Sequence, residues 1–150
     1  MNLLRRTATA FASIAALAAC SNPTHVVEQA RMERQRQIWN AQDIDDYRMT
    51  VHMGGGMIAG AAVVEVRDGV PVSVQPAGPG PGQIPLSAFA KYDTVEELFD
   101  VLEHAFETDA HHIHAEYDAR YGLPVSVSID PREDMVDEEH GFTVQGFTKL

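Results

Sequence analysis

The chain has 150 residues, a net charge of −11 at neutral pH and a single cysteine, Cys20. A charge this negative disfavours binding to nucleic acid, which requires a positive surface along the phosphates. One cysteine cannot form an intramolecular disulfide, so the fold must be stabilised by its hydrophobic core.

Residues 1–19 are predicted to be a signal peptide. Arg5 and Arg6 form a positive start, and an uncharged stretch rich in Ala, Phe, Ile and Leu follows over residues 8–19. The stretch fits the about 7–15 apolar residues of a signal-peptide core and is shorter than the ~20 residues that span a bilayer. We therefore expect a cleaved signal and not a transmembrane anchor.

The segment Leu17-Ala18-Ala19-Cys20 resembles the lipobox of bacterial lipoproteins. This resemblance implies cleavage before Cys20, lipidation of its sulfur, and an anchor of more than one acyl chain, which holds stably to a membrane. Ser21 in place of an aspartate favours the periplasmic side of the outer membrane if the host has two membranes. The alternative is an ordinary secretory signal that is cut near Ala19.

Residues 20–26 are expected to form a lipidated tether, followed by a single domain over residues 27–150. The absence of Gly and Pro from Val27 to about Ala41 predicts a helix, with Met32 and Trp39 on its apolar face. Three arginines between residues 31 and 36 could contact lipid headgroups, although a solvated helix face is the favoured explanation.

Alternating apolar and polar residues predict a half-buried strand at Tyr47–Met53. The glycine-rich residues 54–60 are expected to form a flexible connection. Asp68-Gly69 lies between two apolar runs and predicts a hairpin with a type I′ turn, because glycine accepts a positive φ without strain. Four prolines and three glycines over Pro76–Pro85 predict a surface loop.

A second helix is predicted to follow Thr94 and to run to about Thr108, because Thr94 and Glu97 have the spacing of a capping box. Apolar residues at helical spacing predict one buried face on this helix. Further strands are expected at His112–Asp118, Leu123–Ile129 and Phe142–Phe147. The predicted fold is an α+β domain of two helices packed on an antiparallel sheet, in the order αβββαβββ.

The segment Tyr117-Asp118-x-x-Tyr121-Gly122-x-Pro124 is the most specific part of a wider pattern that includes Trp39, Tyr47 and Thr94. Over roughly residues 35–148 this pattern resembles the bacterial lipoprotein family catalogued as domain of unknown function 6174. Leu123 departs from it, where many relatives carry an aromatic residue. The resemblance implies an exported, often lipidated α+β domain, and it implies no established activity.

His112, His114 and Glu116 alternate along a predicted strand and are expected to share one face. Two imidazoles and a carboxylate are ligands that suit zinc or copper. The alternative is a solvent-facing polar row, which antiparallel sheets often carry.

Residues 130–139 contain six acids, which raises the possibility of a calcium site. The spacing does not match the Asp-x-Asp-x-Asp-Gly loop, and Pro131 and Arg132 interrupt the acids, so a solvated connector is favoured.

No nucleophile motif or metalloprotease motif occurs in the sequence, and no cofactor is expected. We expect a non-enzymatic binding or interaction module of the cell envelope, held to the membrane by lipid, whose partner is an envelope protein. The alternative is a zinc- or copper-binding envelope protein that uses His112, His114 and Glu116.

Overall fold

The computed structural model describes residues 23–55, 58–78, 84–134 and 138–150. The predicted signal peptide and Cys20 lie outside these residues. Within the described part, no helix is both long and apolar enough to cross a membrane. The elements, in chain order, are α1 (Pro23–Asn40), β1 (Tyr47–Gly55), β2 (Ile58–Arg67), β3 (Val70–Pro76), the 3₁₀ helix η1 (Leu86–Lys91), α2 (Val95–Glu107), β4 (His112–Tyr117), β5 (Pro124–Asp130) and β6 (His140–Lys149).

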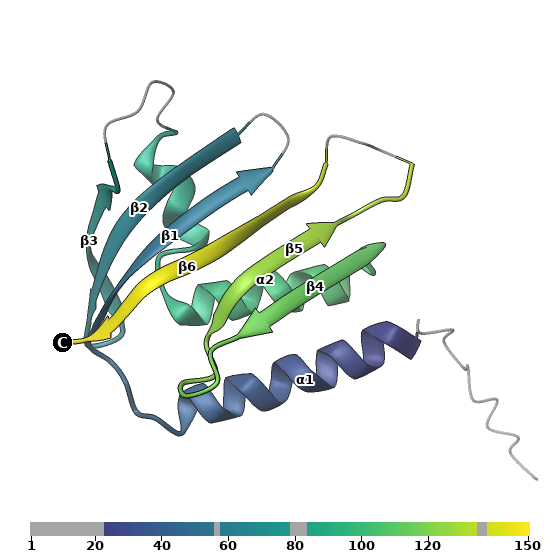
Figure 1. Cartoon of the computed structure of the whole chain (residues 1–150), viewed down its shortest axis with the longest axis horizontal. Coiled ribbons are helices and arrows are strands. Elements are labelled where there is room, and N and C mark those ends of the chain that lie inside the picture. The colour runs from purple at the N-terminus through teal and green to yellow at the C-terminus, as the bar shows by residue number, and fades with distance from the viewer. Residues whose placement is uncertain (1–22, 56–57, 79–83, 135–137) are drawn as a thin grey trace, which may run out of the picture.

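The six strands form one antiparallel sheet in the order β3-β2-β1-β6-β5-β4 (Figure 1). Each half is a meander of three consecutive strands, and pairing of β1 with β6 joins the halves in the middle. The first and last strands therefore lie at the centre of the sheet, while β3 and β4 form its two edges.

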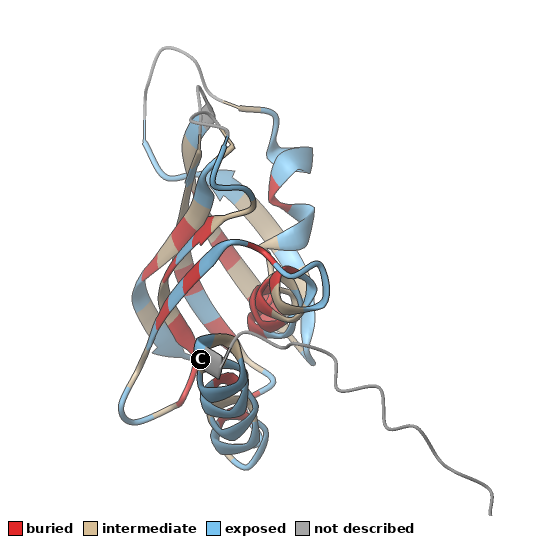
Figure 2. Cartoon of the chain, turned by 90° about the vertical axis from the view of Figure 1, so that its right-hand side faces the viewer, coloured by how far each residue is buried: buried red, intermediate tan, exposed pale blue. Residues whose placement is uncertain are grey.

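Helix α2 lies behind one face of the sheet and provides much of the core (Figures 1 and 2). The predicted cap is confirmed, because the Thr94 side chain accepts a hydrogen bond from the Glu97 backbone N–H at 3.1 Å. The predicted apolar face is confirmed as well, with Val95, Leu98, Phe99, Leu102 and Ala105 all buried. These residues pack against the inward-pointing residues of the strands, including Met49, Val51, Val64, Ile129 and Phe142.

The predicted architecture, two helices packed on the sheet in the order αβββαβββ, is wrong in two respects. A 3₁₀ helix, η1, stands between β3 and α2 and is anchored by the buried Phe89. Helix α1 does not cover the sheet face; it lies along the β4 edge and against α2 (Figure 1). Met32 and Trp39 are its buried apolar residues, and an apolar stripe this narrow cannot cover a sheet. The chain is a mixed α+β fold.

The Asp68-Gly69 hairpin is confirmed, since both residues have a positive φ, 49° and 72°, as a type I′ turn requires. The expected flexible connection over residues 54–60 is wrong. Strands β1 and β2 continue into it, with Gly54 paired to Ala59, because a hairpin needs only two residues to turn. Only glycine fits at position 55, because a side chain there would collide with the backbone of Glu139.

Candidate functional site

The predicted row on β4 has the expected orientation. His112, His114 and Glu116 are exposed, while Ile113 and Ala115 between them are buried. The row lies on the sheet face opposite α2. The His114 Nε2 atom is 3.7 Å from a Glu116 carboxylate oxygen, and both side chains are more than half exposed. Such a pair is a weak surface interaction.

The three side chains of this row do not form a metal centre in the structure. His112 and Glu116 are four residues apart on one strand, a separation of roughly 13 Å. One ion could reach both only if both side chains leaned along the strand. Among the described residues, no group of three His, Cys, Asp or Glu is placed to hold a metal ion.

The acidic loop after β5 uses its acids in local contacts. The Asp130 carboxylate accepts a hydrogen bond from the Arg132 backbone N–H at 3.1 Å. The Arg132 guanidinium lies 3.8 Å from Asp134 and 3.6 Å from Glu138. Asp137, which belongs to the predicted calcium loop, lies outside the described residues. Two of the described acids of this loop therefore lie beside an arginine, which competes with a cation for them.

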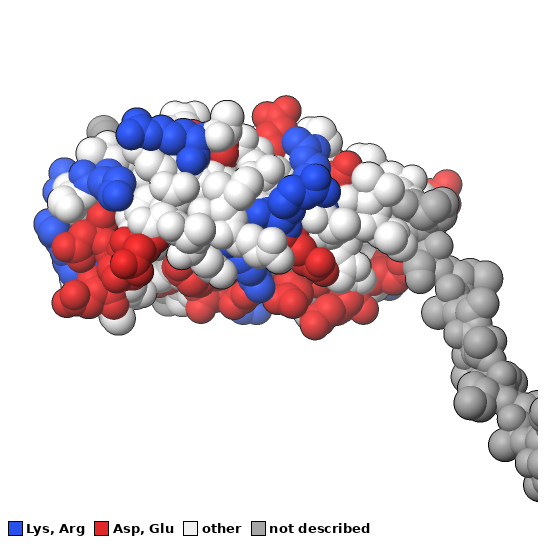
Figure 3. Space-filling view, turned by 90° about the horizontal axis from the view of Figure 1, so that it is seen from below, with Lys and Arg blue, Asp and Glu red and all other residues white. Residues whose placement is uncertain are grey.

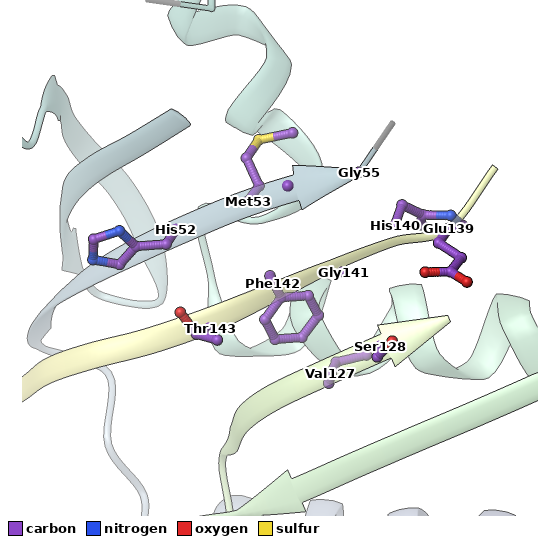
Figure 4. Close-up of a pocket in the computed structure, with 11 residues that line it drawn as sticks. His52, Met53, Gly55, Val127, Ser128, Glu139, His140, Gly141, Phe142 and Thr143 are labelled. Carbon is purple, nitrogen blue, oxygen red and sulfur yellow. The ribbon is translucent and has the colours of Figure 1, made fainter. Parts of the chain in front are cut away.

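A shallow hollow of about 590 Å³ lies at the end of the sheet where β1, β6 and β5 run side by side (Figure 4). Gly54, Gly141 and Ser128 lie across from one another on these strands and leave little side-chain bulk. Glu139 and His140 stand at the rim in Figure 4. The hollow has a mixed polar and apolar lining and is wide open, and such a surface holds a small ligand poorly.

A second cavity, which we call the α2 groove, has about 450 Å³ between α2 and the ends of β5 and β6. Its walls are mainly apolar and its rim is polar. The rim carries two carboxylates, Glu97 and Asp100, and the nitrogen-bearing side chains of Lys91, His104 and His140. The apolar lining residues are Tyr92, Val101, Ala105, Ala110, Ile129 and Pro131, and the rim residues are Lys91, Glu97, Asp100, His104, Thr108 and His140.

Tyr92 positions one wall of the α2 groove. Its backbone N–H donates to the Phe89 carbonyl at 2.7 Å and so ends η1. Its ring packs edge-on against Phe142, with centroids 5.8 Å apart. Burial raises the pKa of the Tyr92 hydroxyl above its usual range, so the group is neutral at physiological pH. The sequence prediction missed this groove, because no motif marks a cavity formed by a helix, a 3₁₀ helix and two strand ends.

The Tyr117–Pro124 segment that carries the family resemblance forms a turn between β4 and β5. The Asp118 carboxylate accepts the backbone N–H groups of Arg120 and Tyr121 at 2.8 and 2.7 Å. Gly122 has φ +79°, and a Cβ there would lie 2.6 Å from the Gln35 carbonyl oxygen of α1. The turn is therefore shaped to let α1 approach closely.

Two further residues of the same pattern fix α1 and α2 to the sheet. The Trp39 indole N–H donates to Glu96 at 2.8 Å, and its ring packs at right angles to Tyr47. The Tyr47 hydroxyl accepts the Val95 backbone N–H at 2.9 Å, at the first residue of α2. Burial raises the pKa of Tyr47 well above its usual range. These residues serve the packing of helices and show no reactive group.

A model of a family of unknown function, DUF6174, matches residues 31–149. The chain belongs to this family. The match runs from α1 into β6, so DUF6174 covers the whole sheet, and it confirms the resemblance to domain of unknown function 6174. No curated protein and no solved structure matches the chain. The DUF6174 assignment identifies the domain and brings no activity with it.

Proposed function

We propose that this DUF6174 protein is an exported lipoprotein, anchored through Cys20 to the extracytoplasmic face of a membrane, and that it is a non-enzymatic binding module. The lipobox-like segment and the apolar stretch before it support the anchor. The folded domain begins at Pro23, three residues after Cys20, so the anchor would hold the domain directly at the membrane surface.

The α2 groove is the observation that carries the binding proposal. Pockets of about 300–1,000 Å³ with mainly apolar walls and a few polar groups are typical of ligand sites. The groove has that size and that lining. Val101 is only partly buried, so a partner could cover apolar surface that the domain leaves accessible.

The occupant that we propose is an apolar side chain of an envelope protein, because the groove opens along α2 and carries charges on its rim. Lys91 and Glu97 lie on that rim and offer both signs of charge to polar groups around an inserted side chain. An apolar anchor within a polar rim is the usual arrangement of a protein interface.

Photocrosslinking in intact cells tests this site. His104, on the groove rim, is replaced by the photoreactive p-benzoylphenylalanine, and the same replacement of the exposed Val72 on β3 is the control. A protein adduct is expected at position 104 and not at position 72, and it should disappear in a Val101→Trp variant that fills the groove. A small-molecule adduct, or equal adducts at both positions, would contradict a protein partner in the groove.

Mass spectrometry of the mature protein tests the anchor separately. The expected N-terminal residue is a diacylglyceryl-modified Cys20, and a Cys20→Ser variant should lose both the modification and flotation with membranes. A free thiol at Cys20 in the mature chain would refute the membrane assignment and leave the groove untouched.

A further inference from the structure

The inner face of helix α1 packs against the rest of the domain, and its outer face is exposed. Met32 and Trp39 are buried at 2% and 3% exposure and mark the inner face. The residues that point the other way are exposed and share helical spacing. We call them the outer face of α1: Val26, Val27, Ala30, Glu33, Arg34 and Gln37.

Two valines stand unburied at the start of this outer face. Val26 is 52% exposed and Val27 is 66% exposed, whereas six of the other twelve valines in the described residues are buried. They lie in the first two turns of an otherwise polar helix. An apolar pair in this place gains free energy if a non-aqueous surface covers it.

The arginines of α1 are divided between the two faces. Arg36 turns toward α2 and pairs with Asp100 at 2.6 Å and Glu103 at 3.0 Å, so it is not available to lipid headgroups. Arg31 lies over the Tyr117 ring and within 3.6 Å of Glu28. Arg34 remains exposed on the outer face. Of the three arginines that could contact lipid headgroups, only Arg34 therefore lies on the outer face. Arg31 lies beside that face.

Of the two acids of α1, only Glu33 lies on the outer face, where Arg34 stands beside it and balances its charge. Helix α1 has three arginines and only two acids, Glu28 and Glu33, in a chain with a net charge of −11. Figure 3, which looks at the molecule from the side of α1, shows many of the acidic side chains along the lower border and a few others among the basic side chains above it. The N-terminal end of a helix also carries a partial positive charge. An anionic surface would therefore meet little net negative charge on this face.

We propose that the outer face of α1 rests on the phospholipid surface, with Val26 and Val27 in the interfacial region and Arg34 at the headgroups. This inference rests on the proposed anchor at Cys20. Pro23 follows Cys20 by three positions, a span of at most about 10 Å, and Val27 lies about 6 Å further along the helix. The valine pair is therefore held where the bilayer begins, and the helix fixes how the domain faces the membrane.

The test uses the mature lipidated protein in vesicles of phosphatidylethanolamine and phosphatidylglycerol. A nitroxide label is attached at Val27→Cys, and the matched control is Val72→Cys on the distant β3 edge. Because the sulfur of Cys20 would be acylated, the new cysteine is the only free thiol. Collisions with membrane-dissolved oxygen, relative to a water-soluble nickel chelate, should be several-fold more frequent at position 27 than at position 72.

Three outcomes separate this inference from the proposed function. If the protein floats with the vesicles and only the label at position 27 contacts lipid, the inference is supported. If it floats and both labels remain aqueous, the inference is overturned and the anchor stands. If it does not float, both the anchor and the inference fail. An Arg34→Glu change should reduce the lipid contact of the label at position 27. Arg120→Glu, at an exposed arginine of the β4–β5 turn, should leave that contact unchanged. Equal effects of the two changes would contradict the proposal that the outer face of α1 rests on lipid.

Discussion

Gly122 allows α1 to lie close to the β4–β5 turn. Replacing it by alanine should lower the stability of the domain through two effects, one conformational and one steric. The first cost is conformational, because φ is +79° and an L-residue in this region loses about 1–2 kcal/mol. The second is steric. The new Cβ would lie 2.6 Å from the Gln35 carbonyl oxygen and 3.0 Å from the Ile38 Cβ. The carbonyl belongs to the helix backbone, so α1 itself must shift, at about 1–3 kcal/mol for overpacking.

Gly69 supplies the matched control for this change. Its φ is +72°, and a Cβ there would have no atom within 4 Å, so Gly69→Ala incurs the conformational cost alone. We expect Gly122→Ala to lower the free energy of unfolding by about 2–5 kcal/mol and Gly69→Ala by about 1–2 kcal/mol. For a domain of this size, each kcal/mol lowers the melting temperature by roughly 3–5 °C. Urea and thermal unfolding measure both variants, and equal losses would refute the argument that this turn is built to contact α1.

Three further predictions concern buried hydroxyls, pH and metal. Tyr47→Phe should lower stability by about 1–3 kcal/mol, because the Val95 N–H loses its acceptor. Tyr117→Phe should leave stability unchanged or raise it, because the Tyr117 hydroxyl is buried without a hydrogen-bond partner in the described structure. Urea unfolding of both variants measures this contrast, and equal losses of stability would contradict it. Hydrogen bonds from Arg48 and then Arg67 lower the pKa of Glu65, so the stability that this carboxylate contributes is present at neutral pH and is lost as the pH falls through its lowered pKa. The melting temperature of Glu65→Gln should accordingly fall less between pH 7 and pH 3 than that of the wild type or of Glu133→Gln, and parallel curves would argue against the effect. Micromolar zinc should produce no calorimetric heat and no rise in melting temperature, because His112, His114 and Glu116 do not converge; a rise that is lost in His114→Ala would restore the metal hypothesis.

Local elements of this fold could be predicted because their signals are local. The Thr94 cap, the apolar face of α2 and the Asp68-Gly69 turn each depend on residues within a few positions of one another. The alternation of β4 was also sufficient to place His114 on an exposed face. Periodicity of 2 or 3.6 residues decides such features without reference to the rest of the chain.

The arrangement of the elements could not be predicted in the same way. η1 has one buried residue, Phe89, and a single apolar anchor next to a proline-rich stretch gives no periodic signal. The placement of α1 at the β4 edge depends on Gly122 and Trp39, which are 83 positions apart in the sequence. The α2 groove requires Tyr92, Val101 and Ile129 to meet across three elements. Such contacts become visible only when the tertiary structure is known.

The structure gives a physical meaning to the residues that carry the DUF6174 resemblance. The Asp118 turn, Gly122 and the Trp39 indole all bring α1 against the domain, and Arg36 adds ion pairs to α2. An isolated polar helix of this kind would be marginal in water, so these contacts are what hold it in one orientation. If Cys20 carries lipid, a helix fixed in this way transmits the position of the anchor to the whole sheet. A flexible tether would leave the α2 groove facing any direction, whereas a docked α1 gives it one direction relative to the membrane, and an envelope partner meets it in that orientation.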